Sequence, residues 1–159
     1  KVVDYAHRFG VKVYATLNTI IFDSEIEDAK SQAEALVAVG VDALIVQDMA
    51  YCRMGLNVPL HASTQTACSS VEQVKFFEQV GFARAILERN LSGAEIRDIA
   101  QQTDVEIEAF IHGAICVSHS GRCFLSRSMS ERVCVSLFSG TAICCNTPRS
   151  CAAELCRPR

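Results

Sequence analysis

Short apolar runs alternate with amphipathic stretches along the first two thirds of the chain. Between the runs, apolar residues recur every three or four positions, which is the spacing of a helix with one buried face. Strands that alternate with helices, and that are apolar along much of their length, indicate a parallel sheet covered by helices. The pattern therefore predicts an α/β fold of five strands and about four helices. The five predicted strands fall at residues 11–17, 41–46, 58–61, 82–87 and 105–111.

Helix boundaries are marked by capping sequences. Residues 24–27, 70–73 and 92–95 each match Ser-x-x-Glu/Gln, in which a hydroxyl and a carboxylate or carboxamide satisfy free backbone N–H groups. Gly40 and Gly81 follow the last periodic residues of two helices, where glycine commonly ends a helix. Three helices are therefore predicted to start at these serines.

Polar residues follow the predicted strands at one end. They are Asn18, Gln47, Asp48, His61, Gln65, Glu88, Arg89 and His112. This layout is typical of a (β/α) barrel, whose active site lies at the carboxyl ends of its strands. A complete barrel takes about 250 residues, so we expect a partial, TIM-like parallel barrel and a chain that is a fragment of a longer protein. Residues 1–127 would form this barrel part, and residues 128–159 an irregular Cys-rich segment.

Charge is distributed unevenly, although the net charge is only −3. Residues 1–115 carry −7, whereas residues 116–159 carry +4 and contain arginine but no lysine. An arginine-rich tail is suited to a polyanion such as RNA, and an ordinary solvated loop is the alternative. No apolar run reaches the length of about 18 residues that a membrane span needs, and no signal peptide precedes the first strand. We therefore expect a cytoplasmic protein with no membrane partner.

Cysteine is abundant and clustered, with seven of nine cysteines after residue 115. A secreted disulfide scaffold would spread its cysteines evenly, so a reduced protein with a local metal or iron–sulfur site fits better. Cys52 and Cys68 stand apart and are predicted to be small buried residues. Free thiols are the alternative for the tail. The candidate ligands are Cys116, Cys123, Cys151 and Cys156.

Zinc is an alternative metal. Two histidines and two cysteines stand at intervals of four, three and four, so that they would share one face of a continuous helix. Gly113 and Gly121 argue against such a helix. The four residues are His112, Cys116, His119 and Cys123.

Hydrolysis by a nucleophile is a second class of function. It requires Ser or Cys beside a histidine with an orienting carboxylate. Ser63, Cys116 and Glu88 are candidates around the same rim as the histidines, but neither a GxSxG nor an HExxH motif is present. Arg89 can bind an anion in bidentate fashion, or form an ion pair at the strand end. The candidate catalytic residues are His61, Gln65, Arg89 and His112.

Three segments carry a resemblance to a known family. Residues 112–126 read HGAICVSHSGRCFLS, residues 61–69 read HASTQTACS, and residues 86–99 read ILERNLSGAEIRDI. Together they resemble the signature segments of the collagenase-like peptidases, catalogued as peptidase family U 32. The chain departs from the family pattern at His119, where the family usually has Tyr, and in the 27 residues between Cys123 and Cys151.

The resemblance implies a barrel fold and an iron–sulfur cluster held through Cys116, Cys123 and a third ligand similar to Cys151. It implies a peptidase with a peptide substrate as the first expectation. Two alternatives come from the same family. One is iron–sulfur-dependent hydroxylation of tRNA or ribosomal RNA, and the other is a role as an assembly factor in quinone hydroxylation.

Overall fold

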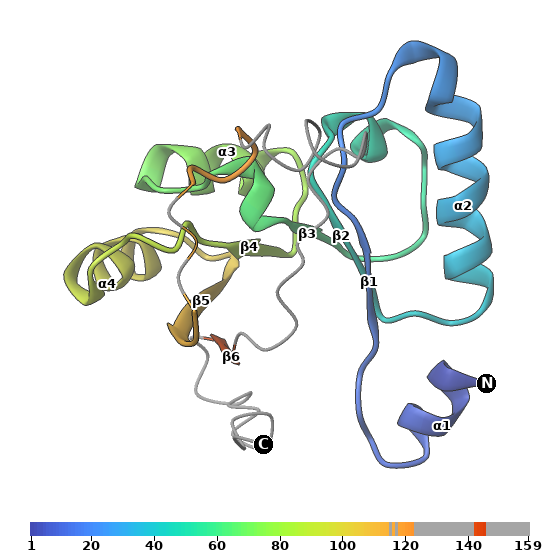
Figure 1. Cartoon of the computed structure of the whole chain (residues 1–159), viewed down its shortest axis with the longest axis horizontal. Helices are drawn as coiled ribbons and strands as arrows, with labels where there is room; N and C mark the ends of the chain where they lie inside the picture. Colours follow the sequence, from blue (N-terminus) through green and yellow to red (C-terminus); the bar gives the residue numbers. More distant parts are fainter. Residues whose placement is uncertain (115, 117, 123–141, 146–159) are drawn as a thin grey trace.

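A computed structural model describes residues 1–114, 116, 118–122 and 142–145. In these residues one sheet contains six strands in the order β1 to β6 (Figure 1). The first five pair in parallel, and β6 pairs with β5 antiparallel. The predicted α/β class with five parallel strands is confirmed. The bounds are β1 (Tyr14–Leu17), β2 (Ala43–Val46), β3 (Leu60–Ala62), β4 (Arg84–Ile86), β5 (Glu106–His112) and β6 (Ala142–Cys145).

Three of the four connections between consecutive parallel strands contain an α-helix. The helix α1 (Val2–His7) precedes β1, while α2 (Ile26–Ala38), α3 (Val71–Gln79) and α4 (Gly93–Gln102) follow β1, β3 and β4. The connection from β2 to β3 contains only the short 3-10 helix η2 (Met49–Arg53). Figure 1 shows α2 and α3 on either side of this thin crossover. Two further 3-10 helices are η1 (Asp23–Glu25) and η3 (Thr64–Thr66).

The predicted helix starts are correct in two cases and wrong in one. Ser92 and Glu95 form a full capping box. Ser70 caps α3 through the N–H of Gln73, 3.3 Å away. Before α2, the chain inserts η1, and the carboxylate of Glu25 accepts the N–H of Phe22 at 3.0 Å. Residues 24–27 therefore do not form the predicted capping box. The carboxylate that accepts a backbone N–H here belongs to Glu25 instead of Glu27, and it caps η1 instead of α2.

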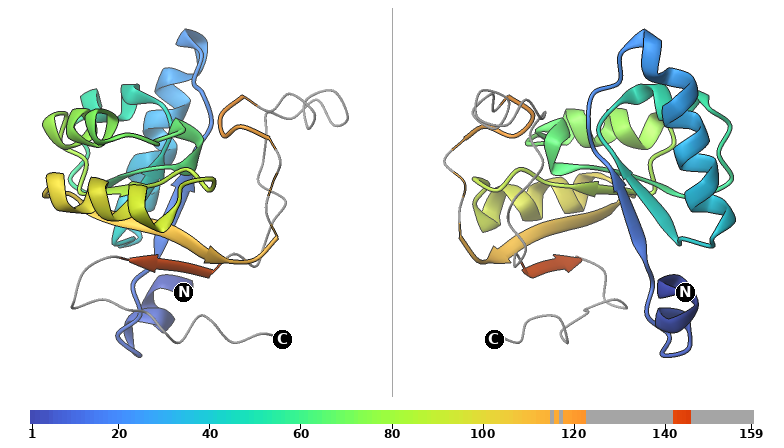
Figure 2. Two further views of the ribbon diagram at one scale, coloured as in Figure 1. Left: turned by 90° about the vertical axis from the view of Figure 1, so that its left-hand side faces the viewer. Right: turned by 45° about the vertical axis from the view of Figure 1, so that its right-hand side comes forward.

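The outer face of the sheet is apolar and packs against the helices. Leu44, Val46 and Leu87 are fully buried there and join one core cluster. Ala33 of α2 and Val74 of α3 belong to the same cluster. Figure 2 shows these helices on one side of the sheet. Burial of aliphatic side chains contributes about 1.5–3 kcal/mol each, so this layer is the main source of stability.

The inner face carries charged and aromatic side chains, named here the inner-face cluster. Arg84 lies between Glu106 and Glu108, with nitrogen–oxygen distances of 2.6 and 2.8 Å. Its guanidinium also stacks over Tyr14, 5.2 Å from the ring centroid. The His61 ring contacts the same tyrosine edge-on, with centroids 4.8 Å apart. The inner-face cluster thus joins β1, β3, β4 and β5.

The five consecutive parallel strands have the order found in the wall of a (β/α) barrel. In the described residues, β6 rather than a further parallel strand pairs with β5, so closure of a barrel stays a prediction. The sequence predicts an irregular segment over residues 128–159, of which the structure describes only β6. That strand was not predicted, and it covers the hydrogen-bonding edge that β5 would otherwise expose.

None of the described helices has the length and hydropathy needed to cross a membrane.

Candidate functional site

The carboxyl ends of the central strands hold a turn from a distant part of the chain. This segment, residues 118–122, is called the docked turn, and Figure 1 shows it in orange above β3 and β4. Arg89 donates from Nη2 to the carbonyl oxygen of Ser118 at 3.0 Å and to Oγ of Ser120 at 2.9 Å. The Ser120 hydroxyl in turn donates to Oε1 of Glu88 at 3.0 Å. One charged pair after β4 therefore anchors the docked turn.

A second anchor comes from the loop after β3. The N–H of Gly121 donates to Oε1 of Gln65 at 2.8 Å. Gly121 has a φ of +72°, and a Cβ at this position would collide with the backbone oxygen of Gln65. Glycine adopts this conformation without strain, which explains why the Ser-Gly-Arg sequence can form so close a contact.

The docked turn lies between the first two predicted cysteine ligands, Cys116 and Cys123, in the sequence. Cys116 is half-buried and lies two residues before it. Cys123 follows directly after Arg122, but Cys123, Cys151 and Cys156 lie outside the described residues. Thiol donors are chemically suited to an iron–sulfur cluster, so the donor type at Cys116 fits this group.

The described residues do not assemble a complete metal site. Among them, no three His, Cys, Asp or Glu side chains gather closely enough to hold a metal ion. This includes His112, Cys116 and His119 of the zinc alternative, whose fourth member, Cys123, is not described. Both metal assignments stay predictions.

Three buried polar atoms lack hydrogen-bond partners in the described part of the chain. They are Oε2 of Glu88, Nε of Arg89 and Nδ1 of His61. Most buried polar atoms in proteins are paired, and unpaired ones are costly. Two of the three lie directly beside the docked turn, but Nε of Arg89 is still 3.5 Å from Oε1 of Glu88 in an ion pair. Oε2 of Glu88 is therefore the rim atom without a hydrogen bond or ion pair in the described residues.

His61 lies inside the sheet instead of at its rim. It is the middle residue of β3 and is 4% exposed. Burial, together with the positive charge of Arg84, lowers the pKa of His61 to about 4. The imidazole is therefore neutral at physiological pH and suited to hydrogen bonding rather than to carrying charge.

The four predicted catalytic residues fall into different surroundings. Gln65 and Arg89 meet through the docked turn. His61 belongs to the inner-face cluster, and His112 is exposed at the end of β5. In the described residues, no hydrogen bond joins either histidine to Ser63, whose Oγ instead accepts the N–H of Gln65 at 3.1 Å. The catalytic roles of these residues remain predictions.

Sequence reasoning missed the inner-face cluster. The apolar runs at 82–87 and 105–111 predict apolar strands, although Arg84, Glu106 and Glu108 occupy alternate positions within them. That spacing is the sign of one polar face of a strand. Ser120 was also missed, because nothing in its local sequence indicates that it links Glu88 to Arg89.

The chain is similar in sequence to several proteins of known name. The chain is 47% identical over 133 residues to the 23S rRNA 5-hydroxycytidine C2501 synthase of Escherichia coli (strain K12), matching 83% of this chain and 20% of that protein. It is 37% identical over 134 residues to tRNA hydroxylation protein P1 of Bacillus subtilis (strain 168), matching 82% of this chain and 32% of the relative. A collagenase of Porphyromonas gingivalis (strain ATCC BAA-308 / W83) is 31% identical over 139 residues, or 79% of this chain and 33% of that protein. The chain thus spans about a fifth to a third of the length of these curated relatives.

The fold has a counterpart among solved structures. The U32 peptidase Mk0906 superposes with a TM-score of 0.55 at 19% identity, covering 67% of this chain and 48% of the other. The model of peptidase family U32 matches residues 1–136, which contain all three resembling segments. The chain belongs to peptidase family U32.

Proposed function

We propose that the protein acts in the hydroxylation of ribosomal or transfer RNA. The observation that carries this proposal is the 47% identity to an rRNA 5-hydroxycytidine synthase. The relative named for tRNA hydroxylation is 37% identical, whereas the one named collagenase is 31% identical. We therefore favour RNA hydroxylation, which the sequence analysis gave as an alternative, over the peptidase function that it gave first.

The geometry of the rim supports this choice. Peptide hydrolysis by Ser or Cys needs a histidine within hydrogen-bond reach of the nucleophile. Within the described residues neither His61 nor His112 has such a partner. The rim instead presents a cysteine beside a turn that Gln65, Glu88 and Arg89 hold in place.

An iron–sulfur cluster is part of the proposal. The thiolates of Cys116, Cys123, Cys151 and Cys156 would hold it. Such a cluster supplies one-electron transfer. The residues around the docked turn would keep Cys116 in place relative to the rim, and Arg122 would favour the negative charge of a thiolate-bound cluster.

Binding of RNA as a function of salt tests the substrate class. Phosphate contacts release counterions, so the affinity should fall steeply as salt increases. Replacing Arg122 and Arg127 with Gln should reduce the slope of log affinity against log salt by about 0.7–0.9 for each lost contact. Arg127 lies outside the described residues. The exposed Arg53 and Arg97, replaced in the same way, serve as the matched control.

Salt-independent binding of RNA, together with cleavage of a denatured collagen peptide, would contradict the proposal and favour the peptidase reading.

A further inference from the structure

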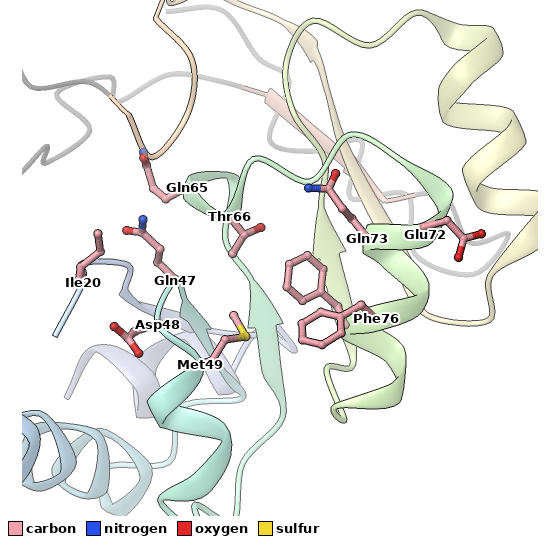
Figure 3. A pocket seen from close by; sticks show the side chains of 10 residues that line it. Ile20, Gln47, Asp48, Met49, Gln65, Thr66, Glu72, Gln73 and Phe76 are labelled. Carbon is pink, nitrogen blue, oxygen red and sulfur yellow. The ribbon is translucent and has the colours of Figure 1, made fainter.

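A pocket opens beside the rim where the outer helix layer is thin. Because η2 alone connects β2 to β3, the space between η2 and α3 is not filled by a helix. The pocket has a volume of about 730 Å³, within the usual range for small-molecule sites. Figure 3 shows side chains from the loops after β1, β2 and β3 facing those of α3 across it.

Two carboxamides present N–H donors whose orientation is fixed. The oxygen of Gln73 accepts the N–H of Ser69 at 2.9 Å, so its NH₂ group must lie on the other side, and Figure 3 shows it directed across the pocket. The oxygen of Gln65 accepts the N–H of Gly121, which leaves the Gln65 NH₂ group available as well. A third carboxamide, that of Gln47, has no hydrogen bond in the described residues and points toward Gln65 in the same figure.

An aromatic ring and a negative wall complete the pocket. Phe76 is 49% exposed and lines it, so one ring face is available for stacking. Asp48 and Glu72 also line it, and their negative charge opposes entry of a phosphate group. Free N–H donors, a stacking face and negative walls together suit a neutral heterocycle with carbonyl acceptors.

We infer that this pocket binds an unpaired RNA base through its carbonyl oxygens, with Phe76 stacked on the base. This rests on the proposed function, because it takes RNA as the substrate. Single-stranded bases are commonly read in this way, by stacking on aromatic side chains and by hydrogen bonds to their edges. The sugar and phosphate stay outside, and Arg122, next to Gly121 in the docked turn, is the nearby cation for the phosphate. Gln65 therefore belongs to both the pocket and the anchor of the turn.

The test uses protein labelled with fluorophenylalanine and free nucleosides followed by ¹⁹F NMR. Phe76→Leu assigns the Phe76 signal. Uridine, cytidine and guanosine should shift this signal in a saturable manner. Adenosine, which lacks a carbonyl group, should bind about threefold to tenfold more weakly because hydrogen-bond donors stay unmatched.

Variants then separate the contributions. Phe76→Leu should weaken binding of unpaired RNA about fivefold to a hundredfold, the range found for loss of one stacked base. Phe9→Leu, at a phenylalanine beyond α1 that is even more exposed than Phe76 (68% against 49%), should leave it unchanged. Gln47→Met, which keeps the side-chain length, should weaken binding about threefold to tenfold, and it serves as the test variant if Phe76→Leu fails to fold.

The outcomes separate the pocket from the proposed function. No shift with any nucleoside, in a protein that still binds and hydroxylates RNA, overturns the pocket and leaves the function standing. The opposite result is that nucleosides shift the signal in a saturable manner, but deletion of the gene changes no nucleoside in cellular RNA. That result would overturn the proposed function and leave the base site standing.

Discussion

The two faces of the sheet are built from the same strands but differ in the kind of side chain that they bury. On the outer face, Leu44, Val46 and Leu87 are fully buried against helices. On the inner face, at alternating positions of the same or neighbouring strands, Arg84 and Glu108 are almost as buried, at 6% and 4% exposed, yet charged. The outer face gains free energy from the hydrophobic effect, whereas the inner face depends on each charge keeping its partner.

The outer face therefore mainly stabilises the fold, whereas the inner face mainly fixes the positions of the strands relative to one another. A buried ion pair is weak evidence for stability, since desolvation offsets much of the attraction. The inner-face cluster connects β3, β4 and β5 laterally, in the register His61–Arg84–Glu106. The ends of these strands hold the docked turn, so the cluster fixes the base on which the candidate site is built.

Removing the charge at the centre of the inner face should have the largest effect. Arg84→Met removes the cation that lies 2.8 Å from the buried carboxylate of Glu108, and breaking a buried pair in this way typically costs about 3–5 kcal/mol. Urea unfolding measures this as a lower midpoint at an unchanged slope. The double variant with Glu108→Gln should recover part of the loss, and an equal loss in both variants would show that the pair is not coupled.

Creating a cavity on the outer face should have a somewhat smaller effect. Leu44→Ala removes a fully buried side chain and should lower the free energy of unfolding by about 3 kcal/mol. Leu44 lies on β2 and Arg84 on β4, with β3 between them and their side chains on opposite faces of the sheet, so the effects of Leu44→Ala and Arg84→Met should add. Strong non-additivity would mean that the two faces are not independent.

The inner face should also make stability depend on pH. The pKa of His61 lies at about 4 in the folded chain, below its usual value of 6.5, because the imidazole is buried beside Arg84. Below pH 6.5 the unfolded chain binds a proton that the folded chain does not, so stability should fall as the pH drops from 6.5 to 4. The expected loss is about 3 kcal/mol. In His61→Phe this part of the pH profile should disappear; a profile identical to that of the wild type would exclude His61 as its source.

A change at the rim should affect stability least. Gly121→Ala places a methyl group against the backbone of Gln65, so the docked turn should detach at a cost of about 1 kcal/mol in global stability. Iron content after anaerobic reconstitution should nevertheless fall strongly. Gly55→Ala, at a position with a similar φ and open space around it, is the control. Full iron content in Gly121→Ala would argue against a role of the docked turn in holding the cluster.

The sequence predicted the periodic features well. The five parallel strands follow from apolar runs, and two helix starts follow from capping serines, because both signals are local. Of the two cysteines predicted to be buried, Cys68 is fully buried, whereas Cys52 is only half-buried. Gln65 and Arg89 were placed at one rim because polar residues follow strands in chain order.

Contacts between distant segments could not be predicted in the same way. The hydrogen bond from Gly121 to Gln65 joins residues far apart in the chain, and no periodicity reports it. The strand end at His61 was placed one residue early, since a single buried histidine resembles a rim residue when only its neighbours in sequence are considered. The pairing of β6 with β5 likewise depends on an edge that exists only in the folded sheet.

The proposed role in RNA hydroxylation, through a site at the docked turn, can be tested directly. The direct measurement is mass spectrometry of nucleosides from ribosomal and transfer RNA of a strain that lacks the gene, complemented with wild type, Cys116→Ser or Cys52→Ser. A hydroxylated nucleoside should be missing in the deletion strain, return with wild type and Cys52→Ser, and stay missing with Cys116→Ser. An identical set of nucleosides in all four strains would contradict the account.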